Sequence, residues 1–493
     1  MKRTYLLVLL ICQLLFYSVS AQPKYEFRAA WVATVTNIDW PSAGNFDTDS
    51  QKEEFIKLLD MHQRNGLNAV IVQVRPSTDA FYPSPYEPWS EWLTGKQGLP
   101  PSPYYDPLAF MITETHKRGM EFHAWCNPYR AEFSLGKSSI AITHVTRVHP
   151  EWFISYGGKR YFDPGNKDVQ QYVTGVIRDL VKRYDIDAIH FDDYFYPYRV
   201  AGEQLPDETS YAKYNNGLSK DDWRRSNVDS VILFLSRAIK EENKYCKFGV
   251  SPFGVWRNND KDPEGSATKA GQTNYDDLYA DILLWLKKGW IDYITPQLYW
   301  EFGHKLVGFE TLIDWWSKHA YGRQLYIGHG IYRAYERNSP GYKNPHELPN
   351  QIKKLRQYST VQGSVYFSSK SFVRNPNGWS DTLRDNYYKY PALIPPMLWL
   401  DSIRPAKPTI IKQSNQVWQI SARGQKRIKY FILYSLPGNH LQNPDSLSII
   451  EILPSVNSEA FFNIDEHAVF CKNGCAVSVM NQNNLESDTG LLR

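Results

Sequence analysis

Residues 186–198 read I-D-A-I-H-F-D-D-Y-F-Y-P-Y, an apolar run that passes without a turn into two acids and three tyrosines. Because side chains alternate along a strand, we expect His190 and Asp192 on one face and Ile189 and Phe191 on the other. Barrel enzymes carry their reactive groups at the carboxyl ends of buried parallel strands, which is where this pattern places Asp192. A solvated acid pair that caps the end of a strand is the alternative.

Short apolar runs alternate with helix-like segments up to about residue 372, which predicts strand–helix units around a parallel sheet. Eight runs are expected to be strands, at 27–35, 67–75, 121–127, 186–192, 247–252, 291–298, 325–331 and 363–368. Helix signals fall at 49–65, 107–118 and 168–184. Eight parallel strands close a barrel, so we predict an α/β fold with a (β/α)8 TIM barrel over residues 22–395. The polar, turn-rich stretches 200–229 and 256–276 are expected to be loops that either build a substrate cleft or only decorate the barrel.

The pattern breaks at residues 391–396, P-A-L-I-P-P, and short runs separated by Asn, Gly, Pro and Ser follow. Strands are expected at 409–412, 416–422, 429–434, 448–453, 460–463 and 476–481. Residues 400–493 therefore resemble a small all-β fibronectin type III-like sandwich. Cys471 and Cys475 bracket Lys-Asn-Gly, a sequence typical of a hairpin turn, so either a cross-strand disulfide or two buried thiols is expected.

Composition describes a globular protein, with 42% hydrophobic and 15% aromatic residues in a chain of 493 residues. The many Tyr and Trp residues suit stacking on sugar rings or a ligand-lined cleft. A formal net charge of +4 on so long a chain, without a cluster of Lys and Arg, argues against a nucleic-acid partner.

The first 21 residues are typical of a signal peptide: Lys2 and Arg3, an apolar run over 5–17, and then S-V-S-A, with cleavage expected after Ala21. Ile11 stands before Cys12 where lipidation requires a small residue, so a lipoprotein is disfavoured. No later stretch is long and apolar enough to span a bilayer, so no transmembrane anchor is expected after cleavage. We expect an exported protein of the periplasm or cell envelope, or a secreted one.

Polar side chains stand at the ends of several predicted strands. They are Gln73, Arg75, His123, Trp125, Asn127, His190, Asp192, Gln297, Tyr299 and His329. Any one of them could be an ordinary core or loop residue, but the ends of parallel strands in a barrel converge on one site. We therefore expect several of them to meet there.

Hydrolysis of a glycosidic bond needs two carboxyl groups, and Asp192 is the first candidate. Asp193, Glu87, Asp79 and Glu301 are candidates for the second. In a regular strand Asp193 would point away from Asp192 and would hold a loop or an arginine instead. Glu301 follows the sixth strand and either reaches the cleft or is a solvated loop acid, while Glu87 either acts in the site or anchors its loop.

Aromatic residues near the strand ends are candidates for sugar subsites, and about half are expected to be core packing. They are Trp31, Trp40, Trp89, Trp92, Trp125, Tyr129, Tyr194, Tyr196 and Trp300. Arg75 and Arg130 either bind a carboxylate such as a lactyl or uronic acid group, or pair with neighbouring acids. The sequence has no phosphate loop, dinucleotide-binding glycine motif, nucleophile elbow or zinc-spaced ligand set, so no cofactor and no metal are predicted.

Several motifs together resemble one family. They include F-R-A-A-W-V at 27–32, Q-V-R-P at 73–76, E-P-W-S at 87–90, H-A-W-C-N-P-Y-R at 123–130, H-F-D-D-Y-F-Y-P at 190–197 and P-Q-L-Y-W at 296–300. Over residues 25–390 the chain is identified as a member of glycosyl-hydrolase-like family 10, secreted bacterial proteins that include the divisome-localised peptidoglycan glycosidase type. The resemblance implies a (β/α)8 barrel and glycoside hydrolysis, with denuded peptidoglycan strands as one substrate precedent.

The sequence thus predicts an exported glycoside hydrolase acting on a polysaccharide, with Asp192 as the central catalytic carboxylate. The residues expected to bind substrate are Trp31, Arg75, His123, Trp125, Asn127, Arg130, His190, Tyr194, Gln297, Tyr299 and Trp300. The alternative is a catalytically inactive carbohydrate-binding barrel at the cell envelope. A deacetylase or esterase ranks last, since neither a metal triad nor an activated serine is evident.

Overall fold

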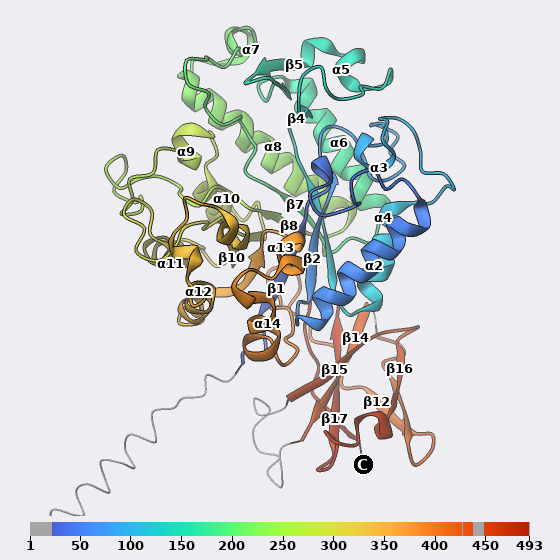
Figure 1. Ribbon diagram of the computed structural model, residues 1–493. Helices are drawn as coiled ribbons and strands as arrows, with labels where there is room; N and C mark the ends of the chain where they lie inside the picture. The colour runs from blue at the N-terminus through green and yellow to red at the C-terminus, as the bar shows by residue number, and fades with distance from the viewer. Residues whose placement is uncertain (1–21, 426, 437–447, 493) are drawn as a thin grey trace, which may run out of the picture.

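The computed structural model describes residues 22–425, 427–436 and 448–492 (Figure 1). Its main body is a closed barrel of eight parallel strands, which lie around the barrel in the order β1-β11-β10-β9-β8-β7-β3-β2. They are β1 (Phe27–Val32), β2 (Ala69–Arg75), β3 (Glu121–Cys126), β7 (Ala188–Phe191), β8 (Lys247–Val250), β9 (Tyr293–Ile294), β10 (Gln324–His329) and β11 (Val361–Tyr366). The prediction of an eight-stranded barrel is confirmed, while the expected signal peptide lies outside the described residues.

The sixth barrel strand is shorter than predicted. Of the run 291–298, β9 keeps only Tyr293–Ile294 as regular strand. Pro296 has no backbone N–H to donate, so the regular hydrogen-bond pattern stops before it. Gln297 still forms single bridges with Phe253 and Gly328, and the chain therefore continues along the barrel wall and carries Gln297 to the mouth.

Helices lie around the barrel and above its mouth (Figure 1). They are α2 (Thr48–Arg64), α3 (Glu91–Thr94), α4 (Pro107–Lys117), α5 (Val145–Val148), α6 (Lys167–Arg183), α7 (Glu208–Tyr214), α8 (Lys220–Glu242), α9 (Asn274–Asp277), α10 (Ile282–Lys288), α11 (Phe309–Lys318), α12 (Glu347–Leu355), α13 (Ser369–Arg374) and α14 (Trp379–Thr382). The three predicted helices appear as α2, α4 and α6. In α6, Val169, Val173, Ile177 and Leu180 are buried at helical spacing, which is why this segment packs on the sheet as a helix.

The stretch 200–229 is only partly a loop, which corrects the prediction. It contains α7 and the first residues of α8, and α8 begins where the Ser219 side chain accepts a hydrogen bond from the backbone N–H of Asp222. Ser followed by two acids in the first helical turn is a helix start signal. The polar composition of this stretch reflects an exposed helix start rather than irregular chain.

A small antiparallel sheet that the sequence pattern did not predict lies above the barrel mouth (Figure 1). Its strands β4 (Arg130–Glu132), β5 (Phe153–Tyr156) and β6 (Lys159–Phe162) are arranged in the order β4-β6-β5. Gly157 and Gly158 join β5 to β6 with φ of 56° and 70°, a conformation at both central turn positions that favours glycine. This Gly-Gly pair is the sequence feature from which the hairpin turn could have been predicted.

The C-terminal part of the chain forms two antiparallel sheets. One has the order β12 (Thr409–Lys412), β13 (Val417–Ser421), β16 (Glu459–Asn463), and the other β15 (Ser448–Pro454), β14 (Ile428–Ser435), β17 (Cys475–Asn481), β18 (Gly490–Leu492). An apolar cluster that includes Trp418, Phe431, Phe462 and Val477 joins the two sheets. The six predicted strands are confirmed, β18 was missed, and kinship with fibronectin type III modules stays a prediction. Cys471 and Cys475 form a disulfide, so the alternative of two free thiols is wrong.

The larger C-terminal sheet packs under the barrel, at the amino ends of its strands (Figure 1). Tyr430 and Ile432 belong to one apolar cluster with Leu393 from the end of the barrel segment. Lys429 forms an ion pair with Asp187, and the Asn484 side chain donates to the carboxylate of Glu121, 2.9 Å away. These contacts close the barrel floor, so the opposite end is the one open to ligand.

Candidate active site

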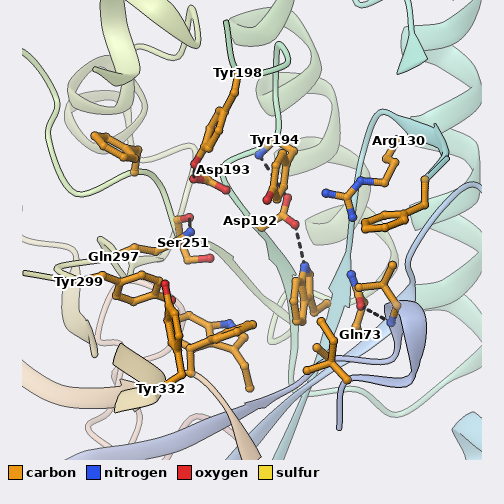
Figure 2. A pocket seen from close by; sticks show the side chains of 18 of the residues that line it. Gln73, Arg130, Asp192, Asp193, Tyr194, Tyr198, Ser251, Gln297, Tyr299 and Tyr332 are labelled. Carbon is orange, nitrogen blue, oxygen red and sulfur yellow. Dashed lines mark hydrogen bonds between the residues drawn. The ribbon is translucent and has the colours of Figure 1, made fainter. Parts of the chain in front are cut away.

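A cavity of about 490 Å³ lies at the carboxyl ends of the barrel strands (Figure 2). Nine of the predicted site residues line it: Trp31, Trp125, Arg130, Asp192, Asp193, Tyr194, Gln297, Tyr299 and Trp300. The expected convergence of strand ends therefore holds for these residues. Gln73, one of the strand-end candidates, lines the cavity as well. The lining also includes residues that were not predicted: Phe133, Lys159, Tyr198, Ser251, Phe253, Tyr332, Arg333 and Phe367.

Asp192 follows β7 directly and is 4% exposed. Its Oδ2 accepts hydrogen bonds from the indole N–H of Trp125 at 3.2 Å and the amide of Asn127 at 3.1 Å. Both donors come from β3 and the residue after it, the strand that pairs with β7 in parallel. These bonds fix the orientation of the carboxyl group at the cavity wall.

Burial raises the pKa of Asp192 from 3.8 to about 7, because the charged form loses its hydration. The guanidinium of Arg130 and the hydrogen bond from Trp125 lower this pKa, and the neighbouring Asp193 raises it further. Burial is the largest of these effects. At neutral pH a large fraction of Asp192 is therefore protonated and able to donate a proton.

Asp193 lines the same cavity as Asp192 (Figure 2), so the alternation expected of a regular strand does not apply here, while its contact with Tyr198 agrees with the expectation that it holds a loop. β7 ends at Phe191, and strand alternation therefore does not extend to residues 192 and 193. The Tyr198 hydroxyl donates a hydrogen bond to Asp193. Burial raises the pKa of Asp193 to about 6, although the bond from Tyr198 opposes this rise. Two carboxyl groups with separate pKa values thus face one cavity.

Arg75 and Glu87 form a buried ion pair away from the cavity lining. The Arg75 Nε lies 2.8 Å from one carboxylate oxygen of Glu87, and both side chains are at most 1% exposed. Arg75 also donates to the backbone carbonyl oxygens of Asn127 and Pro128. Glu87 therefore anchors its loop, which was one of the two alternatives predicted for it. Arg75 pairs with this acid and holds the segment that carries Asn127, so it does not bind a carboxylate ligand.

The two other acids proposed as the second carboxyl also lie outside the cavity lining. Glu301 packs against Gly341, so closely that a Cβ added to this glycine would lie 2.4 Å from the Glu301 side chain. The Asp79 carboxylate accepts a hydrogen bond from the backbone N–H of Ser77 at 3.1 Å, and burial raises its pKa to about 7. Both are held by loops after strand ends, a position that sequence spacing alone cannot distinguish from the cleft.

A buried chain of polar groups supports the cavity floor. Tyr293 donates and accepts between two histidines, with its hydroxyl 2.9 Å from the Nδ1 of His123 and 2.9 Å from the Nδ1 of His190. The Tyr293 ring fills the barrel axis over Gly249, where a Cβ would come within 1.9 Å of the ring, so only glycine fits there. His123 and His190, which were predicted to bind substrate, are not among the residues that line the cavity, because both side chains are buried beneath it.

The tautomer of His190 follows from its contact with Trp31, because an indole N–H can only donate a hydrogen bond. The indole nitrogen of Trp31 lies 3.3 Å from the Nε2 of His190, which must therefore accept, and burial holds the pKa of His190 well below its ordinary value. The Ser251 hydroxyl lies 2.9 Å from the same nitrogen. His190 thus positions Trp31 and Ser251, two lining groups, without donating a proton to the cavity. Ser251 follows β8 directly, so the strand-end rule applied to the fifth predicted strand would have found it.

The aromatic candidates divide between cavity and core. Trp31, Trp125, Tyr194 and Trp300 line the cavity. The others belong to the main apolar core or pack against it: Trp40, Trp89, Trp92, Tyr129 and Tyr196. His329, the last strand-end candidate, is also buried in the barrel, where its Nδ1 lies 2.8 Å from Gln351. About half of the aromatic set is core packing, as expected.

In the part of the chain that the structure describes, no group of three or more His, Cys, Asp or Glu side chains is placed to hold a metal ion. Over the same residues, no helix is both long and apolar enough to cross a membrane.

The profile of the family described as "Glycosyl hydrolase-like 10" matches residues 26–345, more than half of the chain. The chain belongs to this family. It is 46% identical to the protein named glycosyl hydrolase YngK of Bacillus subtilis (strain 168) over 435 residues, which cover 86% of this chain and 85% of that protein.

The chain is also 39% identical to glycosyl hydrolase DigH of Escherichia coli (strain K12), over 65% of this chain and 76% of that protein. Among solved structures, the glycoside hydrolase domain of PgaB (BpsB) from Bordetella bronchiseptica is 11% identical with a TM-score of 0.46, covering 74% of this chain and 99% of that one. The family itself supports a glycosidase-type function and a carbohydrate substrate.

Proposed function

We propose that this protein is a glycoside hydrolase that cleaves glycosidic bonds of a polysaccharide, with Asp192 as the central catalytic carboxylate. The observation that carries the proposal is a buried Asp192 at the mouth of the barrel, with a pKa raised to about 7, beside a second carboxyl group in the same cavity. Membership of a glycosyl-hydrolase-like family supports it.

The two carboxyl groups take different roles in this proposal. Asp192, whose pKa is raised by burial and whose carboxyl group is held by two hydrogen-bond donors, protonates the leaving glycosidic oxygen, and Asp193 acts as base or nucleophile. Trp125 and Asn127 hold the acid in place.

The cavity wall suits a sugar chain. Trp31, Trp125 and Trp300 provide flat apolar faces on which pyranose rings stack, and Gln297 and Ser251 provide polar edges for hydroxyl groups. Glycan strands of peptidoglycan are one candidate substrate. We propose an exported protein of the periplasm or cell envelope, in agreement with the signal-like N-terminal sequence.

The test uses the purified full chain with peptidoglycan and with plant and host glycans, followed by mass spectrometry of released sugars. Wild-type protein is expected to release oligosaccharides from at least one of them. Asp192→Asn is expected to lower the rate by about 100- to 10,000-fold, while circular dichroism shows an unchanged fold. Full activity of Asp192→Asn on that substrate would refute the assignment.

A catalytically inactive carbohydrate-binding barrel is the second candidate. The observation in its favour is that Glu87 and Glu301 lie outside the cavity lining, so both lining carboxyl groups come from adjacent residues of one loop. This candidate predicts that glycans are retained on the immobilised protein and that no sugar is released over the same incubation.

A further inference from the structure

Two cationic side chains reach the cavity from the small sheet above the barrel mouth. Arg130 is the first residue of β4 and Lys159 the first residue of β6, two neighbouring antiparallel strands. Both side chains line the cavity that holds Asp192 and Asp193. The insert after β3 therefore contributes one wall of the candidate site and makes that wall positive.

The guanidinium of Arg130 is held by aromatic rings and, although its charge acts on Asp192, it forms no ion pair among the described residues. Its central carbon lies 4.4 Å from the ring centroid of Tyr194 and 5.4 Å from that of Phe133, so two rings hold it in place. Arg130 is 4% exposed, and its buried Nε has no hydrogen-bond partner. Within the described residues no carboxylate forms an ion pair with it. Ring contacts leave the N–H edge of a guanidinium free, and that edge matches a carboxylate.

Lys159 repeats this arrangement. Its ammonium lies 4.8 Å from the ring centroid of Phe133, the same ring that contacts Arg130. The acid nearest in the sheet is already used, since Glu132 pairs with Arg160 at 2.8 Å. Burial and the charge of Arg130 lower the pKa of Lys159, which shows that the two cations destabilise each other. An anion bound between them would relieve that repulsion.

Gln73 adds a third donor with a fixed orientation. Its Oε1 accepts hydrogen bonds from the backbone N–H groups of Thr34 at 3.1 Å and Val35 at 2.9 Å, so the amide cannot be reversed. The Nε2 is therefore a donor, and it is buried, without a partner and part of a side chain that lines the cavity. Arg130 and Gln73 lie on the same side of Asp192 in Figure 2.

We propose that Arg130 and Lys159, assisted by Gln73, form a subsite for a carboxylate carried by a sugar of the bound glycan. The substrate is then an acidic polysaccharide, and the subsite selects the sugar that lies next to the cleaved bond. A uronic acid and a carboxyethyl ether on a sugar ring both present this carboxylate. The inference rests on the proposed function for its glycan ligand, but the binding test below does not require turnover.

A simpler role for Arg130 is to act only on Asp192, whose pKa it lowers. Lys159 distinguishes the two roles, because it lines the cavity and is not among the main causes of the raised pKa of Asp192. Loss of Lys159 should weaken the binding of an anionic ligand without changing the ionisation of Asp192.

The test is calorimetric binding to the full chain in an Asp192→Asn background, which prevents turnover. The probes are an oligosaccharide of uronic acids and one that contains muramic acid, each compared with a counterpart whose carboxyl groups have been reduced to alcohols. Arg130→Gln and Lys159→Met are each expected to weaken binding of a carboxylated probe by about ten- to 100-fold and to leave the reduced counterpart unchanged. Lys137→Met, an exposed lysine of the same insert, is the matched control and should change neither.

Equal binding of carboxylated and reduced probes, or the absence of binding to both carboxylated probes, would overturn the subsite. Equal affinity of Lys159→Met and Lys137→Met for the carboxylated probes would also overturn it. Preference for one of the two carboxylated probes supports the proposal and identifies the source of the carboxylate. Carboxylate-dependent binding by a wild-type protein that releases no sugar would support the subsite while refuting the hydrolase.

Discussion

The raised pKa of Asp192 makes the candidate acid costly for the stability of the fold. A shift from 3.8 to about 7 corresponds to about 4 kcal/mol of unfolding free energy, since one pKa unit is worth about 1.4 kcal/mol. The sign follows from proton binding. Between about pH 4 and pH 7 the folded state keeps a proton on Asp192 that the unfolded chain releases, so unfolding becomes more favourable as pH rises. This cost is absent well below pH 4 and complete above pH 7.

Asp192→Asn removes the ionisable group while keeping the size of the side chain. The stability of the variant minus that of wild type is expected to increase by about 4 kcal/mol between pH 4 and pH 8. The measurement is denaturant unfolding of both proteins at several pH values across this window. The exchange of an acid for an amide has its own effect on stability, but this effect does not depend on pH. It therefore cancels when the stability difference between variant and wild type is compared at several pH values.

Asp260→Asn is the control, because Asp260 is exposed in a loop and its carboxyl group is hydrated in both states. Its stability difference from wild type should stay flat over the window. If the difference for Asp192→Asn is also flat, burial does not raise the pKa of Asp192, and the assignment of this residue as a proton donor loses its physical basis. If the difference falls as pH rises, the sign of the argument is wrong.

Three further predictions follow from the same contacts. First, kcat/KM on the true substrate should be highest between about pH 6 and pH 7, falling below this range as Asp193 is protonated and above it as Asp192 ionises, which a pH–rate profile measures. Second, Glu87→Gln should lower the unfolding free energy by about 3 to 5 kcal/mol, because it leaves Arg75 charged and unpaired in the core; denaturant unfolding showing a loss below about 1 kcal/mol would contradict this. Third, Lys429→Met should destabilise the protein by about 3 kcal/mol, because Asp187 and Glu121 lose a cation where the C-terminal sheet meets the barrel. Thermal unfolding measures this loss, with the exposed Lys407→Met as a control that should match wild type.

Local sequence patterns determined the barrel. Alternating apolar runs and helical segments predicted eight strands in the right places, because strand and helix periodicity depend on neighbours in the chain. The same reasoning placed Asp192, Gln297 and Tyr299 at the mouth, since the ends of parallel strands converge in any closed barrel. No long-range information was needed for these results.

Tertiary structure decided which polar residues act as ligands and which as supports. Asp193 faces the cavity because β7 stops one residue before Asp192, whereas Glu87 is withdrawn by Arg75, twelve residues away in the chain. The cationic wall depends on a small sheet in which β4 and β6 lie side by side although residues 133–158 separate them in the chain. Ion pairs, strand ends and sheet partners are set by the free energy of contacts between distant segments, and sequence periodicity carries no record of them.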